Sequence, residues 1–178
     1  MKKYCRFLIR HFLLLTVLMF TVSLSGCGYH LGSIGHPQIR TVAIADVKNE
    51  TYEVLISAIL RNVLAERFQF DNTLKLTSLK KADCIVYTRV LEVNNLSISY
   101  RNFNKVENFR PNDFRLSIVV EYTVIMPGKP KPLVPKRIAR GSSLYQFTYD
   151  PAIGRENALR QCALRVADLI VSVTTEAW

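Results

Sequence analysis

Few residues of this 178-residue chain stand in patterns that support bond-making chemistry. No histidine lies beside a candidate serine or cysteine nucleophile, and no glycine-rich phosphate loop precedes a predicted helix. The segment Gly141-Ser142-Ser143 does not match the nucleophile-elbow pattern G-x-S-x-G. His30 and His36 have no metal-ligand spacing to a cysteine, aspartate or glutamate. The sequence therefore predicts a protein that is not an enzyme and that holds no metal and no cofactor.

Cys27 is the residue whose surroundings do predict a covalent modification. Four cations lie within the first ten residues, and an apolar run follows over residues 12–24. This run is shorter than the roughly 20 apolar residues of a transmembrane helix. Small residues then precede Cys27, so the layout is typical of a secretory signal peptide over residues 1–26. A short membrane anchor or a buried helix is the alternative.

The four residues that end at Cys27, Leu24-Ser25-Gly26-Cys27, resemble the lipobox of bacterial lipoproteins. The resemblance implies cleavage before Cys27, a diacylglycerol on its sulfur and an acyl group on its new amine. A thiolate is the nucleophile that takes the lipid, and several acyl chains give stable anchoring. Gly28, rather than Asp, implies sorting to the outer membrane of a Gram-negative bacterium. Residues 27–39, rich in glycine and free of charge up to residue 38, then form a lipidated flexible tether.

The chain is basic, with 24 Lys and Arg against 14 Asp and Glu. Without residues 1–26 the net charge is +6, and residues 101–140, with nine bases and three acids, account for that whole excess. Most of these bases lie in the two loops that flank a predicted strand, so two separate clusters are expected. Clustered Arg and Lys favour a phosphorylated ligand, with solvated loop side chains as the alternative. An exported protein does not meet genomic DNA, so nucleic acid is excluded as the partner.

The elements that position these residues follow from hydrophobic periodicity. Residues 114–126 alternate between apolar and mixed positions without a break, which predicts a strand with one buried face. Further strands are expected over 41–47, 74–79, 84–93 and 138–149, and strand character returns over 96–100. Within 84–93, Ile85 and Val93 are expected on one side of the strand. Helices are expected over residues 52–68, with Asn49 or Thr51 as the cap, and from the Asp150-Pro151 start to the C-terminus, with a buried apolar stripe that includes Cys162.

Residues 40–178 are therefore expected to form one α+β domain. It would be a two-layer sandwich in which two helices pack on one face of a four- to five-stranded, mainly antiparallel sheet. The second sheet face, a mixture of aromatic, aliphatic and basic residues, is expected either to meet a partner or to be an ordinary solvated face. Cys84 and Cys162 are expected to be two buried thiols or, as the alternative, a disulfide.

Several short segments resemble the LptE family of lipopolysaccharide-assembly lipoproteins. They are Gly26-Cys27-Gly28-Tyr29-His30-Leu31 at the expected mature start, Val42-Ala43-Ile44 followed by Val47-Lys48-Asn49-Glu50-Thr51-Tyr52-Glu53, and Ala82-Asp83-Cys84-Ile85-Val86. The closing helix near Trp178 also fits. The resemblance implies an outer-membrane lipoprotein that sits inside the LptD β-barrel. Such a protein plugs the barrel, helps it to assemble, binds lipopolysaccharide and takes part in its insertion into the outer leaflet.

The resemblance marks no basic position as a lipopolysaccharide contact, so the candidates come from charge density alone. They are Arg101, Arg110, Arg115, Lys129 and Lys131. Two other functions stay open at this point. One is a periplasmic lipoprotein that activates a cell-wall synthesis enzyme through a similar small α+β domain, and the other is a surface-exposed adhesin or structural lipoprotein.

Overall fold

The computed structural model describes residues 38–102, 109–146 and 151–176, and leaves the expected lipidation site at Cys27 outside the described residues. The chain divides into two compact units, 1–32 and 33–178, and the described residues all belong to the second. Its elements are β1 (Thr41–Ile44), β2 (Lys48–Asn49), α2 (Ile56–Asp71), β3 (Lys75–Leu76), β4 (Cys84–Asn102), β5 (Phe109–Ile125), β6 (Val134–Gln146) and α3 (Pro151–Thr175).

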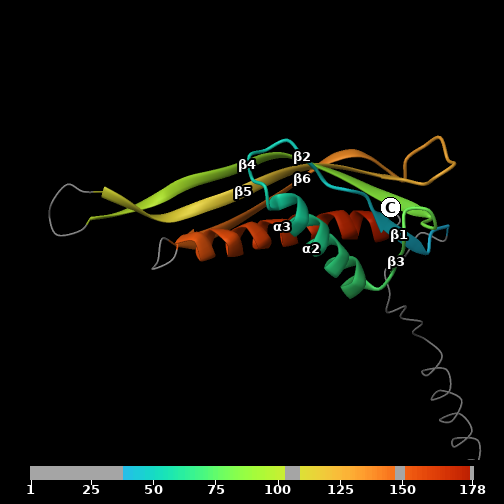
Figure 1. The fold of residues 1–178 in the computed structure, drawn as a ribbon, viewed down its shortest axis with the longest axis horizontal. Coiled ribbons are helices and arrows are strands. Elements are labelled where there is room, and N and C mark those ends of the chain that lie inside the picture. The colour runs from blue at the N-terminus through green and yellow to red at the C-terminus, as the bar shows by residue number, and fades with distance from the viewer. Residues whose placement is uncertain (1–37, 103–108, 147–150, 177–178) are drawn as a thin grey trace, which may run out of the picture. The chain divides into compact units, whose positions relative to one another are not determined.

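The described strands form one sheet in the order β3-β1-β4-β5-β6, and β2 also pairs with β4. The long ladders that join β4 to β5 and β5 to β6 are antiparallel, whereas the short strands β1, β2 and β3 pair in parallel. Both α2 and α3 pack on one face of this sheet (Figure 1). The expected two-layer α+β sandwich is confirmed. The sheet has six described strands, five in the main order and β2 paired with β4, against the four to five expected.

Strict alternation in β5 decides which face of the sheet is buried. Leu116, Ile118 and Val120 are fully buried under the helices, and Arg115 points to the opposite face. We call the first the helix-covered face. The second is the open face, because no described helix packs on it.

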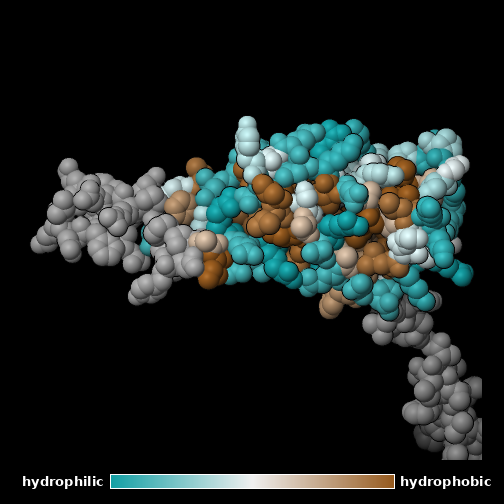
Figure 2. Space-filling model, viewed as in Figure 1, coloured by the Kyte–Doolittle hydropathy of each residue, from teal (hydrophilic) through white to brown (hydrophobic). Residues whose placement is uncertain are grey.

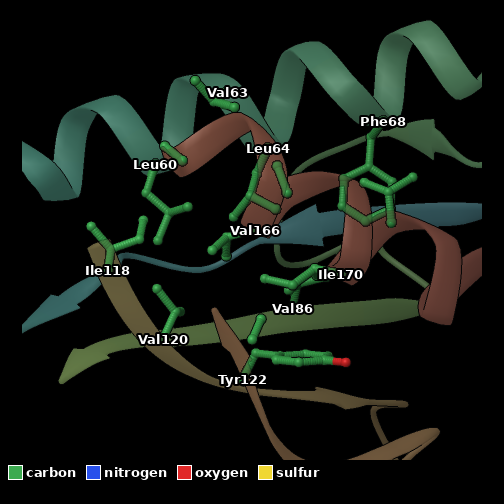
Figure 3. Packing of buried hydrophobic residues seen from close by; sticks show 14 of the residues in the cluster. Leu60, Val63, Leu64, Phe68, Val86, Ile118, Val120, Tyr122, Val166 and Ile170 are labelled. Carbon is green, nitrogen blue, oxygen red and sulfur yellow. The ribbon is translucent and has the colours of Figure 1, made fainter. Parts of the chain in front are cut away.

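The core lies between the helix-covered face and the two helices, as Figure 3 shows. Phe68 and Leu64 of α2 meet Ile170 and Val166 of α3 above the sheet, and all four are fully buried. The apolar stripe expected along the last helix is confirmed. Burial of this kind contributes about 1.5–3 kcal/mol for each large apolar side chain.

Two sequence-based expectations were wrong, one about a side-chain direction and one about the start of a helix. Val93 was expected on the same side as Ile85, but a register shift between Val90 and Glu92 turns it to the helix-covered face, where it pairs with Ile118. A β-bulge adds one residue to its strand and so reverses the alternation beyond it. The expectation failed because the bulge leaves no mark in the apolar pattern.

The second error concerns the start of α2, which was expected at Tyr52 with Asn49 or Thr51 as the cap. Tyr52 lies before the helix and is fully exposed. Asn49 instead closes the preceding loop, since its Nδ2 donates to the Glu53 carbonyl at 2.8 Å and its Oδ1 accepts from the Thr51 amide at 2.9 Å. These side chains satisfy loop backbone groups rather than the helix terminus. The helix begins only at Ile56 and has no side-chain cap bond.

Cys84 and Cys162 are both free and buried, so the expectation of two buried thiols is confirmed. Burial raises the pKa of Cys84 to about 12 and the pKa of Cys162 to about 11. Both thiols are therefore protonated at neutral pH. As a neutral donor, the Cys162 Sγ bonds the Leu116 carbonyl at 3.3 Å and ties α3 to β5.

Gly141 brings β6 unusually close to α3. A Cβ built on Gly141 would lie 2.2 Å from the carbonyl oxygen of Cys162 and 3.1 Å from a methyl carbon of Val166. No side chain fits at the first of these distances, so the helix backbone rests directly on the strand backbone. The segment Gly141-Ser142-Ser143, which fails as a catalytic motif, therefore has a packing role.

We predict that Gly141→Ala lowers the free energy of unfolding by about 1–3 kcal/mol, the usual cost of overpacking. The clash is with backbone, which side-chain rotation cannot relieve. Urea denaturation followed by circular dichroism measures the change. The matched control is Gly154→Ala in α3, where the new Cβ would meet its nearest atoms at 3.4 Å and helix propensity favours alanine. Equal stability of the two variants would contradict the assigned close contact.

Candidate functional site

Arg115 is the candidate residue whose surroundings the structure describes most fully. It lies on the open face of β5, opposite Leu96 of β4 on one side and Leu144 of β6 on the other. Both leucines are more than half exposed, at 61% and 62%. Cross-strand neighbours of this kind lie in side-chain contact range. The three residues therefore form an amphipathic row, with one guanidinium between two apolar side chains.

A recess of about 310 Å³ adjoins this row along β6, which has β5 as its paired neighbour and forms one edge of the sheet. Arg115 and Leu144 line it together with Ser142, Ser143 and, from α3, Arg165. Among the described interactions, neither guanidinium makes an ion pair. The Ser143 hydroxyl donates to the Leu144 carbonyl at 3.5 Å, and no described hydrogen bond involves the Ser142 hydroxyl. Two cations and two hydroxyls around one recess suit a phosphate group, which accepts charge-assisted bonds.

The contact at Gly141 explains why residues from two layers share this recess. It seats α3 against β6 at Cys162, and Arg165 follows one helical turn later. Ser142 and Ser143 follow Gly141 directly in the strand. The close backbone packing therefore brings a helix arginine to the strand edge.

Arg165 is the residue of this recess that sequence analysis missed. It lies outside residues 101–140, the segment that holds the excess charge, and its place on the polar side of the α3 stripe was the available signal. Ser142 and Ser143 were considered only as a catalytic motif and were set aside.

The other predicted basic residues lie elsewhere. Arg101 and Arg110 pair in register between β4 and β5, near the start of β5, and their side chains lie outside the description. Lys129 and Lys131 are exposed in the loop that follows β5. Most of the 17 residues of β5 lie between the pair of Arg101 and Arg110 and the pair of Lys129 and Lys131. A strand extends by about 3.4 Å per residue, so the distance between the two pairs is roughly 50 Å. The backbone positions of the two pairs therefore lie near opposite ends of this strand, but Arg101 and Arg110 lie within β4 and β5 and not in the loop expected before the strand.

Most other bases whose contacts are described are neutralised by acids. Arg89 pairs with Glu50 at 3.1 Å, and Lys136 pairs with Glu121 at 3.6 Å. Further pairs link Arg61 to Asp46, Arg67 to Asp168, Arg155 to Glu53 and Arg160 to Glu66. A second cavity on the open face, of about 230 Å³, is lined by both signs of charge, including Arg89 and Glu121. It therefore lacks the one-signed lining of the Arg115–Arg165 recess.

The described residues contain no group of three or more His, Cys, Asp or Glu that could hold a metal ion. No helix in this part of the chain has the length and apolar character needed to cross a membrane. The fold is a small α+β domain, and its recess is lined by cationic, polar and apolar side chains.

The comparison with protein families identifies this domain further. A family model described as LptE, lipopolysaccharide-assembly, matches residues 39–173. The chain belongs to the LptE family. The resemblance seen in the short sequence segments is thus confirmed over most of the chain.

Solved structures show the same fold at low sequence identity. A protein from Xanthomonas campestris is 9% identical, with a TM-score of 0.54, and the match covers 80% of this chain and 90% of that one. A PelC dodecamer from Paraburkholderia phytofirmans is 11% identical, with a TM-score of 0.51 and coverage of 82% and 96%. A hypothetical protein from Chlamydia trachomatis is 15% identical, with a TM-score of 0.50 and coverage of 75% and 94%. The search of curated proteins gives no match.

Proposed function

We propose that this chain is an outer-membrane lipoprotein that plugs an LptD-type β-barrel, helps that barrel to assemble, and binds lipopolysaccharide on its way to the outer leaflet. Membership of the LptE family supports the proposal. The observation that carries it is the amphipathic row of Leu96, Arg115 and Leu144 beside the recess shared with Arg165.

This surface matches the chemistry of lipopolysaccharide. The lipid part of that molecule carries phosphates and acyl chains side by side. Arg115 and Arg165 supply guanidinium groups that bind phosphate oxygens in a bidentate manner. Leu96 and Leu144 supply exposed apolar surface for the acyl chains. An enzyme would need a base that activates a serine in the recess, whereas the other side chains that line it are two arginines and a leucine.

The proposal also includes Arg101 and Arg110 among the lipopolysaccharide contacts. Their backbones lie opposite each other in the two strands, on the same stretch of sheet as Arg115. Lys129 and Lys131 lie too far from this group to share one phosphorylated headgroup.

The open face also supports contact with a barrel. Tyr87 and Ile138 are 41% and 51% exposed on strands β4 and β6, and no described helix covers them. Exposed apolar residues on a sheet face mark interaction surfaces when they gather in patches. Figure 2 shows the molecule from the side on which α2 and α3 are visible, and there too apolar patches alternate with hydrophilic residues.

The proposal places a lipid anchor on Cys27, with residues 1–26 removed as a signal peptide. The anchor would hold the domain at the periplasmic side of the outer membrane, within the barrel. No other cofactor is part of the proposed function.

We predict that the double variant Arg115→Gln, Arg165→Gln binds lipopolysaccharide roughly tenfold or more weakly than the parent chain, because each charge-assisted bond contributes about 1.5–3 kcal/mol. Binding of labelled lipopolysaccharide to the purified protein, measured across a salt series, gives the effect. The salt dependence should weaken in the variant.

The matched control removes two positive charges elsewhere. Arg61→Gln, Arg160→Gln changes the net charge by the same amount, at exposed positions that pair with Asp46 and Glu66. Binding should stay close to that of the parent. Equal losses in the two double variants would show that overall charge, and not the recess, binds the glycolipid.

We also predict that the native lipoprotein, extracted from membranes in mild detergent, brings a large β-barrel with it. The open sheet face would otherwise leave its apolar residues in water. Affinity purification followed by mass spectrometry identifies the partner. Recovery of a cell-wall synthesis enzyme in place of a barrel would contradict the proposal and favour an activator of that enzyme.

A further inference from the structure

Five exposed bases gather at the end of the sheet where the chain enters the domain. They are Arg40, Lys80, Lys81, Lys129 and Lys131, and we call this group the tether end. Three of them, Arg40, Lys80 and Lys81, lie outside residues 101–140, the segment that accounts for the excess of bases over acids in the sequence. Folding brings them together from three separate segments of the chain.

Described contacts hold these segments side by side. The Lys129 Nζ donates to Gln38 Oε1 at 2.6 Å, which joins the β5–β6 loop to the first described residue. The Arg40 amide donates to Asp83 Oδ2 at 2.9 Å, which joins the start of β1 to the loop that carries Lys80 and Lys81. In addition, Val42 of β1 pairs with Cys84 of β4.

The acid within this group does not cancel its charge. Asp83 is bound by the backbone amides of Arg40 and Thr41 and by the Thr41 hydroxyl, and these bonds lower its pKa. It stays ionised and fixes the start of β1, but it is one carboxylate against five cations. Two further acids, Asp71 and Glu176, lie in the helix layer, where they line a cavity that also contains Arg67.

The length of the preceding segment keeps the tether end near whatever holds Cys27. Residues 27–37 are eleven residues, and a fully extended chain spans at most about 3.6 Å per residue, so Gln38 lies within about 40 Å of that anchor. The hydrogen bond between Lys129 and Gln38 holds the β5–β6 loop beside Gln38. Arg115 lies roughly 34 Å along β5 from Ile125, the last residue of that strand before the loop with Lys129.

We propose that the tether end binds the anionic phospholipid headgroups of the leaflet that holds the acyl chains of Cys27. This inference rests on the proposed lipid anchor. Lysine ammonium groups bind lipid phosphates as point charges, and a basic cluster next to an acyl anchor adds a second membrane attachment. The anchor raises the local concentration of headgroups, so weak ionic contacts become effective.

The two basic surfaces then have different lipid partners. The tether end faces the phospholipids of the anchoring leaflet, and the Arg115–Arg165 recess lies further from that leaflet and stays free for glycolipid. Lys129 and Lys131 therefore orient the domain instead of contacting lipopolysaccharide.

The test uses the full chain purified from membranes and placed on vesicles of phosphatidylcholine alone or of phosphatidylcholine with phosphatidylglycerol. A water-soluble amine-acylating reagent is added, and peptide mass spectrometry reads each lysine. Acylation at Lys80, Lys81, Lys129 and Lys131 should slow roughly fivefold on the anionic vesicles, and high salt should remove the difference. The internal controls are Lys48 and Lys136, which are exposed elsewhere and should react equally on both vesicles.

Equal acylation of the tether-end lysines on both vesicles would overturn the inference. Uniform slowing of all lysines, controls included, would also overturn it, because the headgroups would then attract the chain without orienting it. A chain that fails to sediment with the neutral vesicles would argue against the lipid anchor and the proposed function, while protection on the anionic vesicles would still support the tether end. Replacing the four lysines by glutamine should abolish the salt-dependent part of sedimentation with anionic vesicles, and replacing Lys48 and Lys136 should not.

Discussion

The apolar layer between two helices and one face of the sheet is the contact on which the rest of this structure depends. It buries Phe68 of α2 and Ile170 of α3 under the helix-covered face, and it brings α3 so close to β6 that Gly141 has no room for a side chain. Because this layer uses only one sheet face, the other face remains open to a partner. The same packing sets Arg165 beside the edge of β6, where a phosphate-sized recess forms.

The surface chemistry follows from where acids and bases pair. Arg89 and Arg155 form ion pairs with Glu50 and Glu53, which lie between β2 and α2. The charges of these arginines therefore stabilise the fold. Arg115 and Arg165 line the recess without a described acid partner, and a second group of exposed bases gathers at the tether end. A protein with two separate cationic surfaces and an expected acyl anchor is suited to work between two lipid populations. It needs no reactive centre for that role.

The sequence predicted the features that depend on local pattern. Alternation over residues 114–126 predicted the buried face of β5, and the stripe around Cys162 predicted the helix-covered core. It missed features that arise only on folding. The predicted start of α2 was wrong because Asn49 bonds groups of its own loop. Arg165 was missed because it joins the recess only through the packing of α3 on β6. Charge counting along the chain also could not show that Arg40 folds next to Lys129.

The central claim is that acyl chains on Cys27 hold a binding domain, without reaction chemistry of its own, at a membrane. The most direct measurement is the mass of the N-terminal peptide from the chain extracted from native membranes. The peptide should begin at Cys27 and carry the added mass of a diacylglycerol and an amide-linked acyl chain. A peptide that begins at Met1, with an unmodified thiol at position 27, would contradict the claim.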